Sequence, residues 1–205
     1  MKNIKTAGIL LAAGRSSRMG QLKALLPWNG KMLIHYQIEQ MQQAGIDPMI
    51  VVLGFQAERL LHSIAGYEVK TVINENYNEG KSSSIRKGLM EIQEQVDGIF
   101  ISAVDQPVPF EVLIKMKKDL ASNKAAVIIP TNENKRGHPI LFRGSLHKEL
   151  LNIREQTKGL RGVIHAYQDQ ITYLEVNDSS ILFNLNRPED YLKKRQEASN
   201  ESIRN

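Results

Sequence analysis

The feature that most limits the fold of this chain is an alternation of short apolar runs with longer stretches of helical periodicity. The first apolar run, Thr6–Leu11, leads into a glycine-containing loop, as a buried parallel strand does. Helical spacing follows over Gly30–Ala44, and the next apolar run is Pro48–Leu53. Alternating strands and helices form a mostly parallel sheet covered on both faces. We therefore predict an α/β fold of three layers (α/β/α), Rossmann-like, with a mixed, mostly parallel sheet.

The alternation continues to residue 129 and then becomes less regular. Before that point, the pattern predicts helices at Gln56–Ile64, Ser82–Gln95 and Phe110–Leu120, and strands at Glu68–Ile73, Gly98–Val104 and Ala125–Ile129. After it, the pattern predicts a loop at Thr131–Gly137, strands at Pro139–Phe142, Ile171–Val176 and Ile181–Leu185, and helices at Leu146–Asn152, Leu160–Tyr167 and Glu189–Glu197. We expect a single domain over residues 1–197 and a frayed tail over residues 198–205.

Composition narrows the classes of function. No apolar run approaches the ~20 residues that a membrane-spanning helix needs, and Ala7–Ala13 is too short for the core of a signal peptide. The chain has no cysteine, which excludes disulfides and thiolate metal sites. We therefore expect a cytoplasmic protein without a membrane partner. The net charge is +5, but aromatic residues make up only 6% and the basic residues are scattered, which favours a small polyanionic substrate over nucleic acid.

The loop after the first predicted strand, Leu11–Lys23, combines two glycines with three basic residues. Gly14 and Gly20 allow the backbone to approach a ligand closely, and backbone N–H groups in such turns point at anions. Five residues separate these glycines, so the spacing is neither that of a P-loop nor that of a dinucleotide-binding loop. From spacing alone, the loop is either an anion site at the carboxyl edge of the sheet or a surface turn with solvated charges.

A longer match indicates a family. The segment Leu11–Pro27, LAAGRSSRMGQLKALLP, closely resembles the signature of nucleotidyltransferases that act on sugar phosphates and on molybdopterin. Further matches to that family follow in the same order at Asn74–Leu89, Val104–Pro107, Arg136–Phe142, Lys158–Gly162 and Asn184–Asp190. The set spans nearly the whole chain and is most similar to the molybdenum cofactor cytidylyltransferases, a MobA-like branch. The resemblance implies the fold of the nucleotide-diphospho-sugar transferases.

The resemblance also implies roles for individual residues. Backbone contacts to the base and ribose fall on the Leu-Ala-Ala-Gly segment, and Arg18 and Lys23 match the residues that hold the triphosphate. The implied nucleotide-binding residues are Leu11, Ala12, Ala13, Gly14, Arg18, Lys23, Asn74, Gly80 and Ser84. Without the resemblance, Asn74–Gly80 has the composition of an ordinary polar loop between a strand and a helix.

Asp105 directly follows the predicted strand Gly98–Val104, which places a carboxylate at the carboxyl edge of the sheet. Mg²⁺ binds one or two carboxylates together with water and phosphate oxygens, so Asp105 is the expected metal ligand. The alternative is a helix N-cap, but Pro107 and Pro109 separate Asp105 from the next predicted helix. Arg18, Lys23 and Asp105 are thus the predicted catalytic residues.

The resemblance places a second metal contact at Asn186. Many relatives have Asp-x-Asp there, whereas this chain has Asn184 and Asn186. An amide oxygen can bind Mg²⁺, although weakly, and guanylyl-transferring relatives also carry Asn-x-Asn. His138 is expected in the substrate pocket or in a structural role, because the attacking phosphate is already ionised at neutral pH and needs no general base.

The implied reaction is transfer of CMP from CTP to the terminal phosphate of Mo-molybdopterin, with Mg²⁺ as cofactor. The implied partners are CTP (or another NTP), Mo-molybdopterin and, transiently, a molybdenum hydroxylase of the xanthine dehydrogenase type. Three alternatives stay open: guanylyl transfer to molybdopterin, nucleotidyl transfer to a sugar phosphate, and a non-catalytic chaperone that carries the cofactor.

Overall fold

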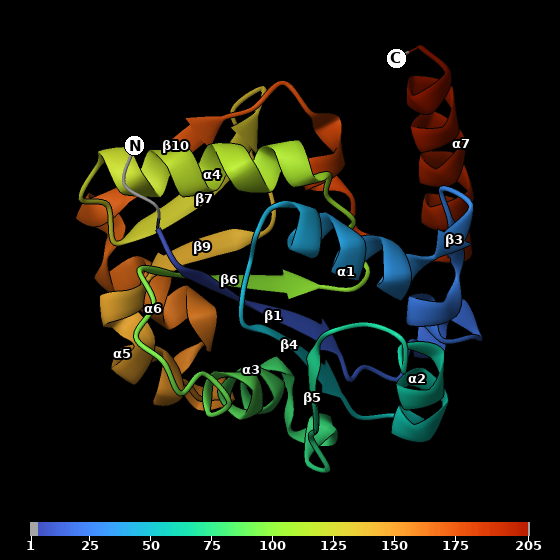
Figure 1. Cartoon of the computed structure of the whole chain (residues 1–205), viewed down its shortest axis with the longest axis horizontal. Coiled ribbons are helices and arrows are strands. Elements are labelled where there is room, and N and C mark those ends of the chain that lie inside the picture. The colour runs from blue at the N-terminus through green and yellow to red at the C-terminus, as the bar shows by residue number, and fades with distance from the viewer. Residues whose placement is uncertain (1–3, 205) are drawn as a thin grey trace.

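The computed structural model describes residues 4–204, with side chains described as far as residue 197. Within these residues the chain forms an eight-stranded mixed sheet with helices on both faces (Figure 1). In the order in which they lie side by side, its strands are β10 Ile171–Glu175, β7 Val127–Asn132, β9 Ile140–Arg143, β6 Gly98–Ala103, β1 Thr6–Ala12, β4 Met49–Leu53 and β5 Lys70–Ile73, and β8 Lys135–Arg136 pairs with β7. Strand β9 runs antiparallel to its neighbours β6 and β7, while β1, β4, β5 and β6 are parallel. The predicted mostly parallel sheet is confirmed.

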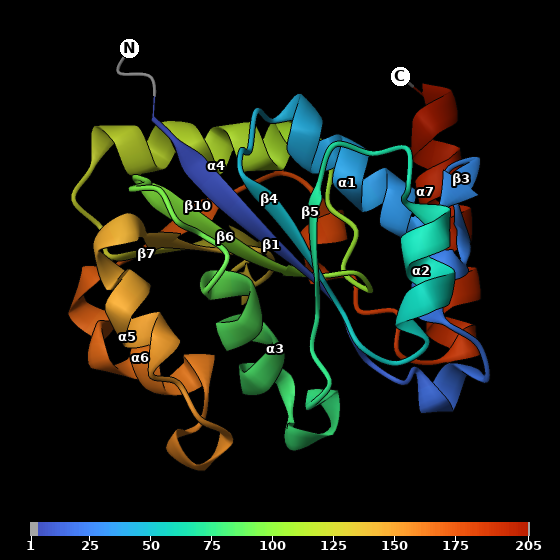
Figure 2. The same ribbon diagram turned by 60° about the horizontal axis from the view of Figure 1, so that its bottom comes forward.

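The helices form the outer layers. Their bounds are α1 Leu33–Gln43, α2 Ala57–Ser63, α3 Lys81–Leu89, α4 Phe110–Ser122, α5 His147–Leu151, α6 Leu160–Ala166 and α7 Pro188–Arg204. Helices α1 and α4 cover one face of the sheet, and α3, α5 and α6 cover the other (Figures 1 and 2). Helix α7 lies at the side, next to a hairpin of β2 Pro27–Trp28 and β3 Lys31–Met32. None of the helices in the described part of the chain is long and apolar enough to cross a bilayer.

Strand β1 shows why the sequence forms three layers. All seven of its residues are buried. Successive side chains of a strand point to opposite faces. Leu10 and Ala12 accordingly join the core under α1 and α4, whereas Ala7, Ile9 and Leu11 join the core under α3 and α5. A strand that is buried at every position therefore needs helices on both sides, as the alternation predicted.

The helix predicted over Gly30–Ala44 begins later, at Leu33. Asn29 and Gly30 both have positive φ, 46° and 80°, and form the two-residue turn of the β2–β3 hairpin. Asn-Gly is the preferred dipeptide of such type I′ turns. The turn chemistry therefore overrides the helical spacing of the residues around it.

Four other expectations are wrong in detail. The predicted loop Thr131–Gly137 contains the end of β7 and the paired strand β8, joined by Glu133 and Asn134 with φ of 50° and 63°. The predicted strand Ile181–Leu185 begins instead inside a 3₁₀ helix, Ser179–Leu182. Helix α3 ends at Leu89 rather than at Gln95, and α7 continues to Arg204 rather than ending at Glu197. These segments are short or polar, and tertiary pairing decides their conformation.

Candidate functional site

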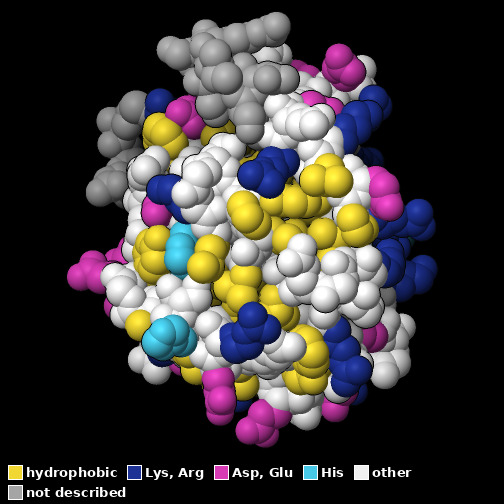
Figure 3. All heavy atoms as spheres, turned by 90° about the vertical axis from the view of Figure 1, so that its right-hand side faces the viewer, with side chains coloured by type: hydrophobic (Ala, Val, Ile, Leu, Met, Phe, Trp, Pro, Cys, Tyr) yellow, Lys and Arg dark blue, Asp and Glu magenta, His cyan; other side chains and the backbone are white. Residues whose placement is uncertain are grey.

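The carboxyl ends of β1 and β6 open onto a cavity of about 300 Å³. Figure 3 shows the side of the molecule toward which these strands point, where hydrophobic side chains gather in the middle with Lys and Arg among and around them. Eight of the predicted site residues line this cavity: Leu11, Ala12, Ala13, Gly14, Lys23, Gly80, Ser84 and Asp105. The structure therefore brings together segments that lie up to 94 residues apart in sequence, from Leu11 to Asp105.

Two turns shape the loop after β1. Ser16 and Gly20 have φ of 53° and 67° and flank the short 3₁₀ helix Ser17–Met19. Met19 and Leu22 are buried and anchor the loop to the core, and the backbone N–H of Lys23 donates to Ser16 Oγ at 3.2 Å. The loop is thus held by packing, while Gly14 has open space above its Cα.

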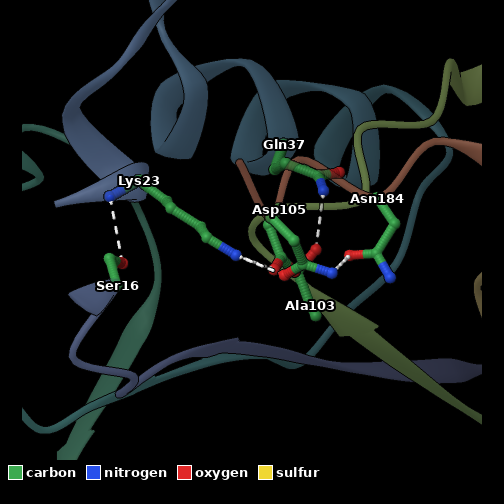
Figure 4. Close-up of polar contacts among 7 residues, drawn as sticks. Ser16, Lys23, Gln37, Ala103, Asp105 and Asn184 are labelled. Carbon is green, nitrogen blue, oxygen red and sulfur yellow. Dashed lines mark hydrogen bonds and ion pairs between the residues drawn. The ribbon is translucent and has the colours of Figure 1, made fainter. Parts of the chain in front are cut away.

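Lys23 links the two predicted metal ligands. Its Nζ donates to Asp105 Oδ2 at 2.7 Å and to Asn186 Oδ1 at 2.6 Å. Lys23 and Asp105 are only 11% and 20% exposed, so water screens this ion pair incompletely. Asn186 Nδ2 in turn donates to Asn184 Oδ1 at 2.7 Å (Figure 4). A basic residue of the first loop and two polar residues far along the chain thus meet at one point.

The backbone around Asp105 is braced from both sides. The buried side chain of Gln37, on α1, donates from Nε2 to the carbonyl oxygen of Ala103 at 3.1 Å (Figure 4). It also donates to the carbonyl oxygen of Gln106 at 2.8 Å. The N–H of Leu185 donates to the Asp105 carbonyl at 3.0 Å, which ties the Asn184–Asn186 segment to the end of β6. Sequence reasoning missed Gln37, because a single glutamine inside a helical pattern carries no signal of its partner.

The oxygen set at Asp105 fits a hard divalent cation. The carboxylate of Asp105 and the amide oxygen of Asn186 already converge on one positive charge, the ammonium of Lys23. Among the described residues there is no group of three or more His or acidic side chains that could hold a metal ion by themselves. Mg²⁺ in nucleotide enzymes is typically bound by one or two carboxylates with phosphate oxygens and water, and here the amide oxygen of Asn186 stands beside the single carboxylate of Asp105.

Arg18 does not line the cavity and is exposed on the loop. Its neighbour Arg15 instead lies over two aromatic rings, with its guanidinium carbon 5.9 Å from the centroid of Phe55 and 5.8 Å from that of Tyr77. Tyr77 also lines the cavity. The predicted contact of Arg18 with a triphosphate stays a prediction.

Asn74 is buried, and its side chain is engaged within the protein. Its Nδ2 donates to Ser83 Oγ and to Ser84 Oγ, both at 2.9 Å, and its Oδ1 accepts from the N–H of Asn76 at 3.1 Å. These bonds tie the end of β5 to the start of α3. The predicted contact of Asn74 with the base or ribose stays a prediction.

Replacing Asn74 with alanine is expected to lower the free energy of unfolding by about 2 kcal/mol, because buried hydrogen-bonding groups lose their partners. Urea unfolding followed by circular dichroism measures this change. Asn152→Ala is the matched control, since Asn152 is exposed and should change stability by less than about 0.5 kcal/mol. Equal effects of the two substitutions would contradict the role assigned to Asn74.

Lys81 also lines this cavity, whereas the predicted site residue His138 does not. Burial lowers the pKa of Lys81, against the opposing effects of the carboxylates of Asp105 and Glu155. Burial and the charge of Lys81 lower the pKa of His138 to about 4, although Asp105 acts in the opposite direction. His138 is therefore neutral at neutral pH. Sequence reasoning missed Lys81 and Glu155, because only the fold brings Lys81 into the cavity with Asp105 and Glu155 to the start of α3.

The low pKa of His138 predicts a pH-dependent stability. The unfolded chain binds a proton at His138 near pH 6.5, whereas the folded protein does so only near pH 4. The folded state is therefore progressively disfavoured as the pH falls from about 6.5 to 4, by about 3 kcal/mol at the low end. His138→Gln should remove this part of the loss, as measured by urea unfolding across that range in EDTA. The exposed His62 provides the control His62→Gln, and parallel pH curves for wild type and His138→Gln would refute the expectation.

Comparisons with known proteins identify the family of the chain. A family model described as the MobA-like NTP transferase domain matches residues 8–171. The chain is 24% identical over 185 residues to molybdenum cofactor cytidylyltransferase of Escherichia coli, covering 90% of this chain and 92% of that protein. It is 25% identical over 180 residues to nicotine blue oxidoreductase of Paenarthrobacter nicotinovorans, covering 84% and 88% respectively.

A solved nucleotidyl transferase from Methanothermobacter has the same fold. It aligns with a TM-score of 0.81 and 24% identity over 98% of this chain and 100% of that chain. The predicted fold type of the nucleotide-diphospho-sugar transferases is therefore confirmed.

Proposed function

Because the chain belongs to the MobA-like NTP transferase domain family, we propose that it transfers CMP from CTP to the terminal phosphate of Mo-molybdopterin. Pyrophosphate leaves, and the product is molybdopterin cytosine dinucleotide, the cofactor of a xanthine dehydrogenase-type hydroxylase. The observation that supports this proposal best is the convergence of Lys23, Asp105 and Asn186 beside the loop after β1. In this proposal residues 1–197 form one cytoplasmic nucleotidyltransferase domain, with Mg²⁺ as its cofactor.

The reaction places two anions next to each other. A terminal phosphate oxygen of the acceptor attacks the α-phosphorus of CTP in line; the new P–O bond forms as the bond between the α-phosphorus and the bridging oxygen of pyrophosphate breaks. The main barrier is repulsion between negative charges, so positioning and charge neutralisation supply most of the catalysis. Asp105 and Asn186 would hold Mg²⁺, which would supply charge neutralisation at the phosphate oxygens.

Residues of the chain bind the two substrates and neutralise the triphosphate. The backbone of Leu11–Gly14 holds the base and ribose, with Gly80 and Ser84 on the facing wall of the cavity. Lys23 leaves its contact with Asp105 and neutralises the triphosphate, together with Arg18. His138, neutral at the working pH, lies on the acceptor side and binds substrate without taking a proton.

Guanylyl transfer to the same acceptor is the second candidate. The paired amides of Asn184 and Asn186 stand where many cytidylyl-transferring relatives have carboxylates, and guanylyl-transferring relatives carry the same Asn-x-Asn. Family membership alone does not decide between reactions, since the relatives include a protein named as an oxidoreductase.

A nucleotide-selectivity assay tests the proposal. Purified protein is incubated with Mg²⁺, Mo-molybdopterin and CTP, GTP, ATP or UTP in turn, and pyrophosphate release and the dinucleotide product are measured. We expect turnover to be fastest with CTP, and none without acceptor or with excess EDTA. Faster turnover with GTP would establish the second candidate. Absence of pyrophosphate release with all four nucleotides would refute the enzymatic function, and transfer of intact cofactor to an apo-hydroxylase would then identify a carrier.

A further inference from the structure

Lys81 is the first residue of α3 and lines the cavity that also contains Lys23 and Asp105. It follows Gly80, whose φ of 105° turns the chain into the helix. Its side chain is open to solvent within the cavity, so a ligand can reach it. The two lysines differ in their present contacts: Lys23 is held by Asp105 and Asn186, and Lys81 is not part of that cluster.

The charges that face Lys81 come from three elements. Asp105 lies at the end of β6, Glu155 in the turn after α5, and His138 just before β9. The two carboxylates raise the pKa of Lys81 but do not offset the loss of hydration, so its pKa stays below the usual value. Because its side chain is exposed toward the cavity, the Lys81 ammonium can meet an incoming anion there directly.

Glu155 is fixed next to Lys81 by the helix itself. Its Oε1 accepts a hydrogen bond from the backbone N–H of Ser82 at 2.6 Å, so this carboxylate occupies the N-terminus of α3. Gly80 leaves the space for it, since a Cβ at that position would lie 2.6 Å from Glu155 Cδ. One backbone N–H group at the N-terminus of α3 is thus already bonded to Glu155. The Lys81 side chain is therefore the group at this helix end that can bind a ligand.

The site has two halves, which come from the strands on either side of β6. The loop Leu11–Lys23 follows β1, and in the strand order β1 lies on the same side of β6 as β4 and β5. His138 and Glu155 belong to segments around β9 and α5, on the other side of β6. Lys81 lines the same cavity as the nucleotide loop, and the next residue, Ser82, is hydrogen-bonded to Glu155, so Lys81 lies where the two halves meet.

We propose that Lys81 is the acceptor-binding cation: its ammonium binds the terminal phosphate of the acceptor, a phosphate monoester dianion, while Lys23 serves the triphosphate of the nucleotide. This inference rests on the proposed function, because a nucleotidyl transfer between two polyanions needs a positive charge at each of them. With Glu155 beside it and His138 uncharged, Lys81 orients the attacking oxygen toward Asp105, where the nucleotide phosphates lie.

Steady-state kinetics of Lys81→Met separate the two phosphate sites. At saturating CTP, the KM for Mo-molybdopterin should rise at least about tenfold, whereas the KM for CTP should stay within about twofold of wild type. Lys81→Arg, which keeps the charge, should restore most of the acceptor affinity. Lys87→Met is the matched control, since Lys87 is an exposed lysine on the same helix. A rise in the KM for CTP instead, or no change in either KM, would overturn the inference.

Equilibrium binding tests the inference without turnover. Wild type, Lys81→Met and Lys87→Met are saturated with Mg²⁺ and α,β-methylene-CTP, a non-reactive analogue, and inorganic phosphate is titrated by calorimetry. Weaker phosphate binding by at least about tenfold in Lys81→Met alone supports the inference. Equal phosphate affinity in all three proteins overturns it. Failure of wild type to bind the analogue refutes the proposed function instead. The phosphate titration of the three proteins is then repeated without nucleotide, and the same comparison of affinities decides the role of Lys81.

Discussion

Replacing Asp105 with asparagine is expected to lower kcat by about a thousandfold. Asp105 is the carboxylate that pairs with Lys23 and lies at the carboxyl end of β6, where the cavity is lined by the nucleotide loop. The amide is nearly the same size, so the packing around the site should persist, but its negative charge is lost. The affinity of the variant for a divalent cation should fall together with kcat. Mn²⁺ titration followed by electron paramagnetic resonance measures this affinity independently of activity.

The matched control for this change is Asp169→Asn. Asp169 is an exposed carboxylate in the short 3₁₀ helix Gln168–Gln170, so its substitution should leave kcat and Mn²⁺ affinity unchanged. Thermal unfolding of both variants checks that the fold is intact. If Asp105→Asn kept wild-type turnover, Asp105 could not be the metal ligand. Lost turnover with retained delivery of cofactor to an apo-hydroxylase would show that the protein also acts as a carrier.

The parts of the site that could be predicted from sequence are those encoded in contiguous segments. The apolar strand β1 and the glycine-containing loop that follows it are adjacent in the chain, so their proximity needs no tertiary information. Asp105 could be placed because a residue that directly follows a buried parallel strand must lie at the carboxyl edge of the sheet. The structure has both groups lining one cavity.

The parts that could not be predicted depend on contacts between distant segments. Glu155 reaches the N–H of Ser82 across 73 positions, and Gln37 reaches the carbonyl of Ala103 across 66. Neither residue belongs to a periodic pattern or a turn signal that would reveal its partner. Lys81 stands in a polar segment in sequence, and only the fold shows that it lines one cavity with Asp105.

Backbone conformation limited the prediction of secondary structure in the same way. The Asn29-Gly30 turn carried a recognisable hairpin signal, which the helical spacing of the following residues obscured. Glu133 and Asn134 form an equivalent turn with φ of 50° and 63°, although glutamate is an unusual residue at positive φ. That hairpin forms because β8 pairs with β7, which is a property of the folded sheet rather than of the local sequence.

Lys23 is hydrogen-bonded to both of the proposed metal ligands. Its ammonium donates hydrogen bonds to Asp105 Oδ2 at 2.7 Å and to Asn186 Oδ1 at 2.6 Å, and both oxygens are the proposed metal ligands. In the nucleotide-free protein a divalent cation must therefore displace Lys23 before it can bind. The triphosphate offers the displaced ammonium a new anionic partner, so nucleotide and metal should bind cooperatively. This coupling is reciprocal, because each ligand removes the same obstacle for the other.

Lys23→Met is accordingly expected to have two opposite effects. Turnover should fall about a hundredfold, because the triphosphate loses a charge-neutralising group. The affinity of the nucleotide-free protein for Mn²⁺ should instead rise about tenfold, because Asp105 is no longer neutralised by an internal cation. Electron paramagnetic resonance titration measures the second effect, with Lys118→Met on the exposed side of α4 as the control. Unchanged or weaker Mn²⁺ binding in Lys23→Met would show that the lysine does not compete with the metal.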